Sequence, residues 1–308
     1  MRETISPFLT YFVLLFLTTS NIFSMESEDA DQGPEYQKIA IAKFRGKLYC
    51  SLGDRDQFSY ISSEDGVTWS SNQEINHQLL SAQSGDISES PAFFEFRGIL
   101  FCAYKRWFDC DFNYSFDFNY TRSASMFELV YTATNDGLDW SRNKDIFQSA
   151  GAIASSSPTL VEFEGKLFCA YNSGVDNSNK LVYSVTKDGT NWANHSQVIN
   201  GVEISGSPSL AKFNGKLFCA YKERDGINKL AYSFSENGND WRIPRAIPHV
   251  RISASPSLAE FNGKLYCVYR WSDGANKLAY TFTENGHEWA HGIVLNRSFR
   301  CKFGNKSI

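Results

Sequence analysis

Apolar and polar residues alternate with a period close to two near the end of the chain. Four such runs follow one another there, at 257–261, 264–269, 277–283 and 292–295. They are separated by the turn dipeptides Asn262-Gly263, Asp273-Gly274 and Asn285-Gly286. Asn-Gly between alternating runs is a strong hairpin signal, because a type I′ turn needs a positive φ at both central residues. The pattern predicts four short antiparallel strands, and no segment after residue 36 keeps a helical period over three turns.

This pattern is one copy of a repeat. Residues 255–289 align without a gap with residues 207–241, which lie 48 positions earlier, and 24 of the 35 aligned residues are identical. The glycine of the first turn recurs as Gly46, Gly98, Gly165, Gly215 and Gly263. The tryptophan that closes each copy recurs as Trp69, Trp140, Trp192, Trp241 and Trp289. The chain therefore holds five units, and a fixed period of this size indicates a repeat architecture.

One four-stranded sheet of this size cannot bury both of its faces, whereas sheets stacked around an axis bury them against each other. We therefore predict an all-β fold, a five-bladed β-propeller of four-stranded antiparallel blades. The blades are expected at about 37–80, 88–148, 155–200, 205–248 and 253–296. A sandwich with irregular strands is the alternative, but it does not account for the regular spacing of the last three units.

The second unit carries an insertion, at residues 107–122. Its distance from turn glycine to closing tryptophan is 42 residues, against 26 in the last two units. Five aromatic residues alternate there with polar ones, so an extended chain places the aromatic rings on one face and the polar residues on the other. The aromatic face either packs on its own blade or serves as a platform for a partner or a sugar.

The N-terminus differs in kind from the rest. Arg2 precedes an apolar run at 8–17, which is placed like the hydrophobic region of a signal peptide and is short for a membrane span. We expect a signal peptide at 1–24, an acidic leader at 25–36 and a C-terminal tail at 298–308. An uncleaved anchor is the alternative. No second apolar run follows, so we expect a secreted protein with no membrane span after signal cleavage.

Composition narrows the class of partner. The formal net charge is −4 and no basic stripe is present, which argues against a nucleic-acid partner. Aromatic residues make up 15% of the chain, which suits a β-rich fold. Five Asn-x-Ser/Thr sequons agree with export and glycosylation, at Asn113, Asn119, Asn194, Asn296 and Asn305.

Five of the seven cysteines are equivalent and lie four residues after the turn glycine, as Cys50, Cys102, Cys169, Cys219 and Cys267. Equivalent positions on different blades lie too far apart for bridging, so we expect buried thiols that pack as small apolar groups. No histidine repeats with them, so no metal and no cofactor is expected. Cys110 and Cys301 fall outside the pattern and are candidates for a disulfide between the tail and the second blade.

The turn before each closing tryptophan carries Gly-x-x-Trp, at 66–69, 137–140, 189–192, 238–241 and 286–289. In this, and in its place within a unit, it resembles the Asp-box of the sialidase-type (BNR) repeat, S-x-D-x-G-x-T-W. The resemblance departs at the acidic position, which is shifted by one residue to Asp65, Asp136, Asp188, Asn237 and Asn285. It implies a propeller in which Asp or Asn with Gly makes the turn and Trp fills space between neighbouring strands.

Enzymes of the sialidase family carry an arginine triad, a Tyr–Glu nucleophile pair and an acid/base Asp on non-equivalent blades. We cannot place that set on this sequence, and Asp225 and Asp273 are repeat-equivalent turn residues. The chain also resembles repetitive propeller lectins, whose blades carry F-x-G-K-L-Y and D-G-x-x-W segments. High identity between units favours a multivalent binder, which gains avidity by repeating one modest site. We therefore expect no catalytic activity.

Candidate binding residues follow the second strand of a unit, where neighbouring units differ. Tryptophan there can stack on a sugar, and asparagine can hydrogen-bond its hydroxyl groups. The candidates are Arg106, Trp107, Arg224, Asn228, Arg270, Trp271 and Asn276, with Lys105, Lys222, Glu223 and Ser272 beside them. The alternative for each is a solvated loop residue.

The function predicted from sequence is a secreted, non-catalytic, lectin-like propeller with repeated weak sites. Its expected partners are glycans or glycoproteins, and its oligomeric state is open. Two alternatives are a protein-interaction scaffold that uses the insertion at 107–122 and a degenerate sialidase- or glycoside-hydrolase-like protein.

Overall fold

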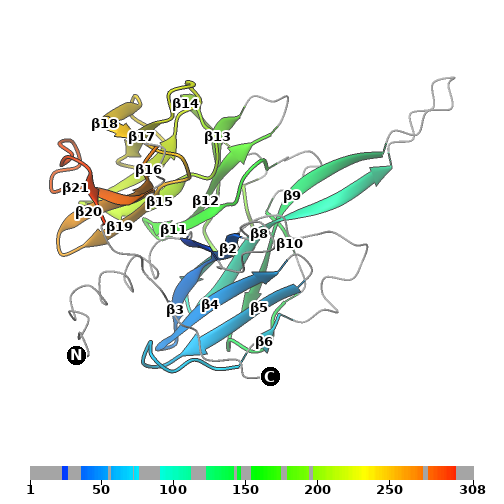
Figure 1. The fold of residues 1–308 in the computed structure, drawn as a ribbon. Helices are drawn as coiled ribbons and strands as arrows, with labels where there is room; N and C mark the ends of the chain where they lie inside the picture. Colours follow the sequence, from blue (N-terminus) through cyan, green and yellow to red (C-terminus); the bar gives the residue numbers. More distant parts are fainter. Residues whose placement is uncertain are drawn as a thin grey trace, which may run out of the picture.

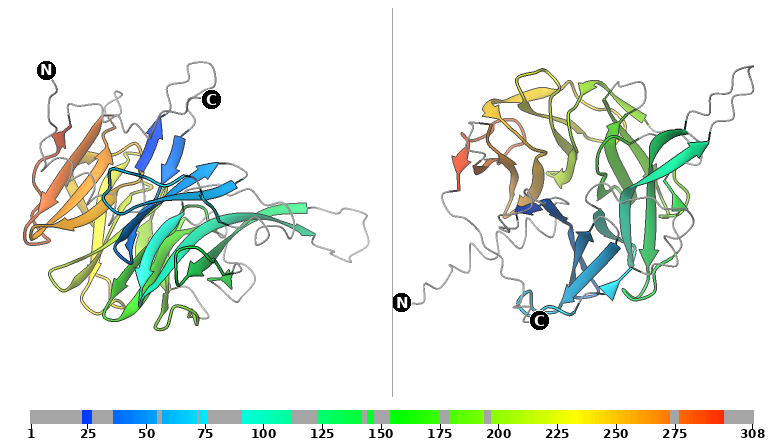
Figure 2. Two further views of the ribbon diagram at one scale, coloured as in Figure 1. Left: turned by 90° about the horizontal axis from the view of Figure 1, so that it is seen from below. Right: turned by 45° about the vertical axis from the view of Figure 1, so that its right-hand side comes forward.

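The computed structural model describes residues 23–26, 36–54, 57–71, 73–75, 91–111, 123–141, 144–146, 154–174, 179–193, 197–272 and 277–295. These residues form strands and turns, and no helix occurs among them. Five four-stranded antiparallel sheets are arranged in a ring (Figures 1 and 2), which confirms the prediction of a five-bladed β-propeller. No helix in the described part of the chain is long and apolar enough to cross a membrane.

Each blade uses four strands in chain order, and the first of them is the innermost. Blade 1 holds β3 (Ile41–Phe44), β4 (Lys47–Asp54), β5 (Gln57–Ser63) and β6 (Gln73–Glu74). Blade 2 holds β7 (Ala92–Phe96), β8 (Ile99–Asp111), β9 (Ser123–Thr134) and β10 (Lys144–Asp145). Blade 3 holds β11 (Thr159–Phe163), β12 (Lys166–Ser173), β13 (Lys180–Thr186) and β14 (Gln197–Glu203).

The last two blades repeat the same order. Blade 4 holds β15 (Ser209–Phe213), β16 (Lys216–Lys222), β17 (Lys229–Ser235) and β18 (Arg245–Arg251). Blade 5 holds β19 (Ser257–Phe261), β20 (Lys264–Arg270), β21 (Leu278–Thr283) and β22 (Ile293–Val294). β14 ends at Glu203 and β18 at Arg251, each three residues past the end of the range expected from the sequence for its blade.

A further hairpin precedes blade 1. It consists of β1 (Phe23–Glu26) and β2 (Tyr36–Ile39), which pair antiparallel. β2 runs almost directly into β3. The sequence pattern gave no signal for this hairpin, because these residues show no clear alternation. The signal-peptide and leader predictions for this region stay predictions.

The first hairpin of each blade turns through two left-handed residues. In blade 4 these are Asn214, with φ of 48°, and Gly215, with φ of 69°. A type I′ turn has this geometry, and its twist matches that of the strands on either side. Blades 1, 2 and 3 adopt the same conformation with Arg45, Arg97 and Glu164 in the asparagine position. The turn is therefore set by its place between two paired strands as well as by Asn-Gly.

The turn before each closing tryptophan is held by one acidic or amide side chain. In blade 3, Asp188 Oδ1 accepts hydrogen bonds from the main-chain N–H groups of Thr190 (2.9 Å) and Asn191 (2.7 Å). In blade 4, Asn237 Oδ1 accepts equivalent bonds from Asn239 (2.9 Å) and Asp240 (2.8 Å). The residue in this position therefore works as a hydrogen-bond acceptor within the turn, which is the structural role expected from the sequence.

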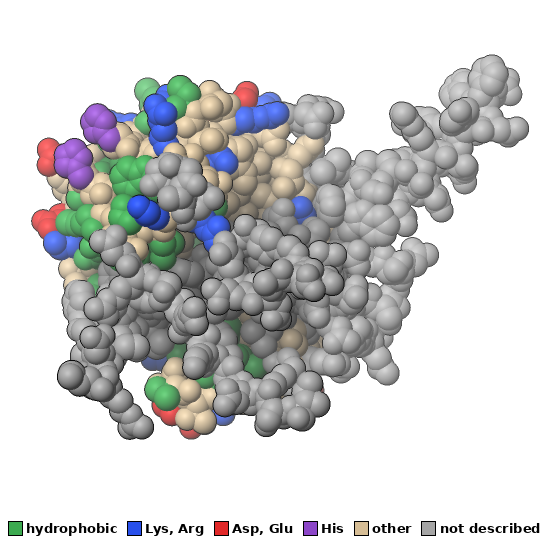
Figure 3. All heavy atoms as spheres, in the orientation of Figure 1, with side chains coloured by type: hydrophobic (Ala, Val, Ile, Leu, Met, Phe, Trp, Pro, Cys, Tyr) green, Lys and Arg blue, Asp and Glu red, His purple; other side chains and the backbone are tan. Residues whose placement is uncertain are grey.

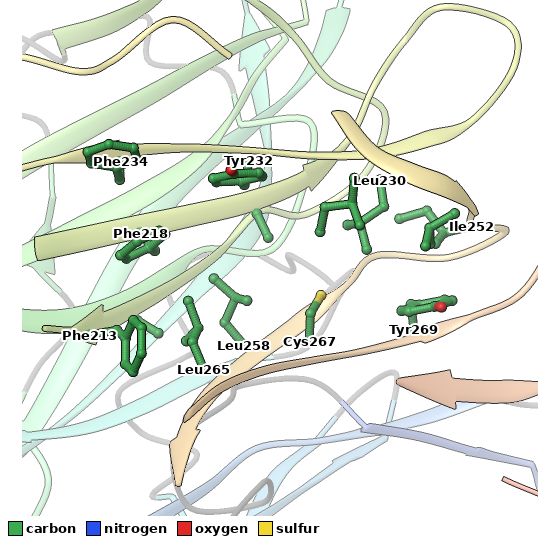
Figure 4. Close-up of a cluster of buried hydrophobic side chains, with 14 of the residues drawn as sticks. Phe213, Phe218, Leu230, Tyr232, Phe234, Ile252, Leu258, Leu265, Cys267 and Tyr269 are labelled. Carbon is green, nitrogen blue, oxygen red and sulfur yellow. The ribbon is translucent and has the colours of Figure 1, made fainter. Parts of the chain in front are cut away.

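The closing tryptophan of a blade packs against a tyrosine of the preceding blade. The ring-centroid distances are 5.9 Å for Tyr60–Trp140, 6.0 Å for Tyr131–Trp192, 5.8 Å for Tyr183–Trp241 and 5.4 Å for Tyr232–Trp289. Figure 4 shows one junction, in which Phe218 and Tyr232 of blade 4 face Leu258 and Cys267 of blade 5. The repeated aromatic residues therefore hold neighbouring blades together.

The five equivalent cysteines are fully buried thiols outside any disulfide, which confirms the prediction of core thiols. Burial raises the pKa of the thiols of Cys102, Cys169, Cys219 and Cys267, because a buried thiolate loses its hydration. The proposed bridge involving Cys301 lies outside the described residues.

The insertion of blade 2 lengthens one hairpin. β8 and β9 have 13 and 12 residues, against 7 each in β16 and β17 of blade 4. Their paired ends extend away from the ring (Figures 1 and 2). Most of the alternating aromatic segment, at 112–122, lies outside the described residues, so the position of its aromatic face is not described.

Candidate functional site

The ring has two ends along its axis. At one of them the innermost strands begin and the second strands end, and this end is called the axial end below. One position there stands three residues after the repeat cysteine, and it is polar in blades 2 to 5. It holds Lys105, Asn172, Lys222 and Arg270. The next position holds Arg106, Ser173, Glu223 and Trp271. The inner parts of the same strands repeat nearly the same apolar residues, so the chemistry differs between blades mainly at this end.

Main-chain hydrogen bonds hold the ends of the second strands of blades 3, 4 and 5 near the innermost strands. The N–H groups of Ser155, Ser205 and Ser253 donate to the carbonyl oxygens of Asn172 (2.8 Å), Lys222 (2.9 Å) and Arg270 (2.9 Å). Each serine precedes the innermost strand of its blade. The end of the second strand is therefore bound to the segment that leads into the innermost strand, beside the axis.

Asn172 links blade 3 to blade 4. Its side chain is 2% exposed, and Nδ2 donates to the carbonyl oxygen of Ile204 at 3.2 Å. Its main-chain N–H donates to Ser156 Oγ at 3.0 Å. Asn172 Oδ1 makes no hydrogen bond within the described structure, although it is buried. A buried acceptor of this kind is normally satisfied by an ordered water molecule or another polar group.

Arg106 forms an ion pair with Glu128. Its guanidinium group donates to the carboxylate of Glu128 on β9, with Nε 2.6 Å from Oε1. Both side chains are about three-quarters buried, with exposed fractions of 28% and 25%. This ion pair makes Arg106 less available to bind a sugar, because the carboxylate of Glu128 already balances the charge of the guanidinium group. Sequence patterns missed Glu128, which stands at the repeat position that holds lysine in blades 3 to 5, as Lys180, Lys229 and Lys277.

The carboxyl groups of Glu223 and Asp225 lie close together in the loop between β16 and β17. Burial, and then the negative charge of Asp225, raise the pKa of Glu223. For Asp225, burial raises the pKa, but hydrogen bonds from the main chain of Ile227 and Asn228 and the contact with Lys229 outweigh it and leave the pKa lowered. Carboxyl groups whose pKa values are pushed apart are typical of sites that exchange protons.

Asp225 also has the turn role that the sequence predicted for it. Its Oδ1 accepts from the main-chain N–H groups of Ile227 and Asn228, both at 2.9 Å, and its Oδ2 lies 3.1 Å from Lys229 Nζ. Asn228 has a positive φ of 61°, and its carbonyl oxygen accepts from the N–H of Ile252 at 2.8 Å. The main chain of Asn228 therefore joins the loop of blade 4 to the entry of blade 5.

The structure places the other predicted residues as follows. The exposed Arg224 donates its main-chain N–H to the carbonyl oxygen of Glu203 at 3.1 Å. Trp271 is half-buried, with its ring 5.9 Å from that of Tyr269. Trp107 pairs with Phe127 in the long hairpin, and Arg270 is half-buried at the end of β20. Asn276 lies outside the described residues. The roles of these residues in binding stay predictions.

A hollow lies at the opposite end, between blades 4 and 5. It has a volume of about 570 Å³, and its lining includes Phe234, Trp241, Arg242 and His287. Glu236 there already contacts Lys216 (3.4 Å) and Arg242 (3.6 Å). On the face drawn in Figure 3, Lys and Arg side chains are scattered among polar groups. In the described residues, no group of three or more His, Cys, Asp or Glu side chains is placed to hold a metal ion.

No model of a protein family matches the sequence, and no curated protein matches it either. Solved structures do match its fold. A protein of unknown function from Dyadobacter fermentans has a TM-score of 0.63 and 10% identity, over 91% of this chain and 85% of that chain. An α-L-arabinanase of Penicillium chrysogenum, complexed with arabinobiose, has a TM-score of 0.60 and 18% identity, over 88% of this chain and 84% of that chain.

The NanB sialidase of Streptococcus pneumoniae has a TM-score of 0.58 and 13% identity. The match covers 87% of this chain and 62% of that chain, so this chain spans less than two thirds of the length of NanB. At these identities the likeness shows a shared propeller fold. It supports a sialidase-like relationship of fold, and it shows neither Asp-box repeats nor a lectin.

This likeness contradicts the expectation of a protein without catalysis, because the solved structures that share the fold are mostly enzymes. The expectation rested on the high identity between blades and on a sialidase catalytic set that could not be placed on the sequence. That identity comes from residues that pack blade against blade, and it carries no information about the axial end. There the blades differ from one another, as a single site built by several blades requires.

Proposed function

We propose that this chain is a glycoside-hydrolase-like propeller that takes a carbohydrate at its axial end. The observation that carries the proposal is the difference between blades at two successive positions, which hold Lys105-Arg106, Asn172-Ser173, Lys222-Glu223 and Arg270-Trp271. One asymmetric ligand on the axis needs a different contact from each blade. A repeated lectin site would need the same contact on each blade.

The residues of this end suit a ligand rich in hydroxyl groups. Cationic side chains, an amide and a carboxyl group lie there on neighbouring blades, and the half-buried Trp271 offers an aromatic surface. Sites for small polar ligands combine a few placed polar groups with aromatic walls. In this proposal Lys222 and Arg270 hold hydroxyl oxygens, and the ring of Trp271 lies against the apolar face of a sugar.

Glu223 is the proposed proton donor. Its pKa is raised, so it holds its proton to a higher pH than an exposed glutamate. A carboxylic acid of this kind protonates the leaving oxygen of a glycosidic bond in glycoside hydrolysis. Asp225 is a positioning residue in this proposal. It stays ionised, orders the loop and keeps the proton on Glu223 by its charge.

The test is a panel of arabino- and xylo-oligosaccharides and aryl sialosides, with binding and product release measured separately. We expect at least one sugar to bind and to be cleaved. Glu223→Gln should keep binding and lower turnover at least ~100-fold, the usual contribution of a general acid. Glu203→Gln is the matched control, because Glu203 is an exposed glutamate near the same loop, and it should change neither quantity.

Two results would count against the proposal. If no sugar of the panel binds the folded protein, the carbohydrate assignment fails. If a sugar is cleaved and Glu223→Gln cleaves it at the wild-type rate, the carbohydrate assignment stands and the role of Glu223 is lost.

The long β8–β9 hairpin favours a second candidate function, a protein-interaction scaffold. Its paired strands extend beyond the ring (Figure 1), and residues 107–111 of the insertion belong to the extended part of β8. Replacing residues 108–126 with a two-residue Asp-Gly turn would leave strands 99–107 and 127–134, close to the length of 7 residues each in β16 and β17 of blade 4. Carbohydrate binding should survive this change if the hairpin serves another partner. Loss of sugar binding in a folded protein would instead assign the hairpin to the carbohydrate site.

Secretion and glycosylation are part of the proposal. The supporting observations are the apolar run at 8–17 and the five sequons. Expression in eukaryotic cells should give a product in the medium whose mass falls after treatment with an N-glycan-removing enzyme. A product retained in the cell at its unmodified mass would contradict this.

A further inference from the structure

The hollow between blades 4 and 5, at the end opposite the axial end, is lined by residues that the proposed function does not use. Its volume of about 570 Å³ lies within the range of pockets that hold small organic ligands. Phe234 and Trp241 are apolar parts of its lining, together with Ile243, which is 85% exposed. Phe234 belongs to the buried junction drawn in Figure 4 and is 5% exposed, so this part of the wall is fixed by packing.

Three cationic side chains share this hollow with one carboxylate. They are Lys216, Arg242 and Arg245, and the carboxylate belongs to Glu236. Its Oε1 atom lies 3.4 Å from Nζ of Lys216 and 3.6 Å from an Nη atom of Arg242. Both contacts are longer than a charge-assisted hydrogen bond, which is about 2.7–2.9 Å long. The hollow therefore has a surplus of positive charge, on a chain whose formal net charge is −4.

Arg245 lies in this hollow without a counter-charge. Its side chain is exposed and makes no hydrogen bond or ion pair with the described residues. Its main chain pairs with Tyr232 in the blade. The equivalent positions of the other blades hold Gln73, Lys144, Gln197 and Ile293. The fold therefore accepts a neutral residue at this position.

Arg242 is not required by the fold either. Its main-chain N–H donates to the carbonyl oxygen of Phe234 at 2.9 Å, and this bond sets where its side chain leaves the blade. The equivalent bond is made in the other blades by the main chain of Ser70, Ser141, Ala193 and Ala290. Blade 4 alone combines arginine at both positions, so these two guanidinium groups are free to bind a ligand.

We propose that this hollow is a second binding site, which takes an acidic sugar that carries a carboxylate or a sulfate group. Arg242 and Arg245 bind the oxyanion, because the guanidinium fork donates two parallel hydrogen bonds to such a group. Glu236 has only its two long ion pairs among the described residues, so its carboxylate can also accept from a sugar hydroxyl group. Trp241 and Ile243 lie against the apolar face of the sugar ring.

The lining favours an acidic sugar over a bare inorganic anion. A sulfate or phosphate ion would use the cationic groups alone, and the carboxylate of Glu236 would repel it. A sugar also uses the carboxylate, as an acceptor for its hydroxyl groups, and the apolar wall. The site lies at the other end of the ring from Lys222 and Glu223, so this inference does not depend on the carbohydrate site proposed at the axial end.

Two sugars that share one ring test the site. Methyl β-glucuronide carries a carboxylate where methyl β-glucoside carries a neutral CH₂OH group. In calorimetric titrations at low salt, the glucuronide should bind at least ~10-fold more tightly than the glucoside, because a hydrogen bond to a charged group contributes this much. Glucose 6-sulfate shows whether a sulfate group can replace the carboxylate, and inorganic sulfate shows what the charge alone contributes.

A double variant, Arg242→Ala with Arg245→Gln, removes both guanidinium groups. It introduces residues that other blades carry at the same positions, so the thermal midpoint should be unchanged. Binding of the glucuronide should weaken at least ~10-fold. Lys144→Gln is the matched control, because Lys144 is exposed and holds the position of Arg245 in blade 2, and it should leave binding unchanged.

Glu236→Gln provides a test that a damaged structure cannot pass. It removes the negative charge beside the two arginines, so the glucuronide should bind this variant more tightly than wild type at low salt. Weaker binding to this variant would contradict the placement of the oxyanion beside Glu236.

Three further results would overturn the proposal. One is that neither acidic sugar binds the folded wild-type protein. Another is that inorganic sulfate or the neutral glucoside binds as tightly as the acidic sugars. The third is that the double variant binds the glucuronide as wild type does. In that case loss of binding in Lys222→Gln would assign the acidic sugar to the axial end, and the carbohydrate site proposed there would stand without this one.

Discussion

Gly286 of blade 5 lies directly against the ring of Phe218 in blade 4. A Cβ atom at Gly286 would lie 2.7 Å from Cζ of Phe218, which is closer than real side-chain contacts allow. Gly189 meets Phe101, and Gly238 meets Phe168, in the same way, at 2.5 Å each. This glycine is therefore required twice, once by its positive φ and once by the ring of the preceding blade.

Gly286→Ala should destabilise the protein more than Gly263→Ala. Both glycines have positive φ, 78° and 73°, so alanine at either position costs about 1–2 kcal/mol of backbone strain. Only Gly286 has a neighbour, because nothing lies within 4 Å of a Cβ at Gly263. Overpacking should add about 1–3 kcal/mol for Gly286→Ala. Chemical denaturation measures both, and equal losses would show that the ring of Phe218 moves aside.

Two buried tyrosines should respond oppositely to loss of the hydroxyl group. Tyr60 Oη donates to the carbonyl oxygen of Gly137 in the next blade at 2.7 Å, so Tyr60→Phe should cost about 1 kcal/mol. Tyr221 Oη is buried and makes no hydrogen bond within the described structure. Tyr221→Phe should leave the free energy of unfolding unchanged or raise it by up to about 1 kcal/mol. A clear loss in Tyr221→Phe would reveal a hydrogen bond to ordered water.

Asp136→Asn should make the protein less sensitive to acid. Hydrogen bonds from the main chain of Leu138 and Asp139 and from the Thr134 hydroxyl lower the pKa of Asp136 from 3.8 to about 2. A carboxyl group with a lowered folded-state pKa stabilises the protein above its unfolded pKa, and this stability is lost as the pH falls from about 4 through about 2. Asparagine keeps the Oδ1 acceptor and does not titrate.

Unfolding curves at pH 7, 4 and 2.5 measure this effect. Asp136→Asn should be less stable than wild type at pH 7, because it lacks the charge that strengthens the hydrogen bonds, and it should lose less stability between pH 7 and pH 2.5. The equivalent turn of blade 4 shows that asparagine is accepted at this position. There Asn237 forms the turn, and its Nδ2 donates to Asp240 at 2.7 Å. The reverse change, Asn237→Asp, places a carboxylate beside Asp240 and should lower stability at pH 7. Identical acid profiles for wild type and Asp136→Asn would contradict the role of the charge.

The five repeat thiols should resist alkylation in the native protein. Cys50, Cys102, Cys169, Cys219 and Cys267 are 0% exposed. Burial raises the pKa of Cys219, so almost no reactive thiolate forms at neutral pH. Peptide mapping after treatment with iodoacetamide should find these five unmodified in the native protein and modified after unfolding. Rapid labelling of any one of them would mark a blade that opens under native conditions.

Much of the fold could be predicted from local sequence patterns. The turn at Asn262-Gly263 and the runs beside it gave the strands, and the spacing of the closing tryptophans gave the number of blades. These features are local or periodic, so a single sequence reveals them. The hairpin of β1 and β2 was missed because neither strand alternates clearly, and its pairing depends on residues ten or more positions apart.

The candidate site was only partly predictable. The segment after the second strand was found because it is where the units differ, and it contains Arg224, Arg270 and Trp271. The partner of Arg106 was not found, because Glu128 reaches it across the β8–β9 pairing and no motif marks that register. Asn172 was missed for a similar reason, since its role is a contact with Ile204 of the next blade.

The sequence by itself determined which residues form strands, where the chain turns and how many times the unit occurs, because hydrophobic alternation and turn chemistry act over a few residues. Tertiary structure alone decided what each repeated residue touches. The ring of Phe218 packs against Gly286, and Asn172 donates a hydrogen bond to the carbonyl oxygen of Ile204, in both cases across a junction between blades. It also decided that the ends of the second strands of several blades lie at the same end of the ring, because only the ring of sheets brings positions about 50 residues apart around a common axis.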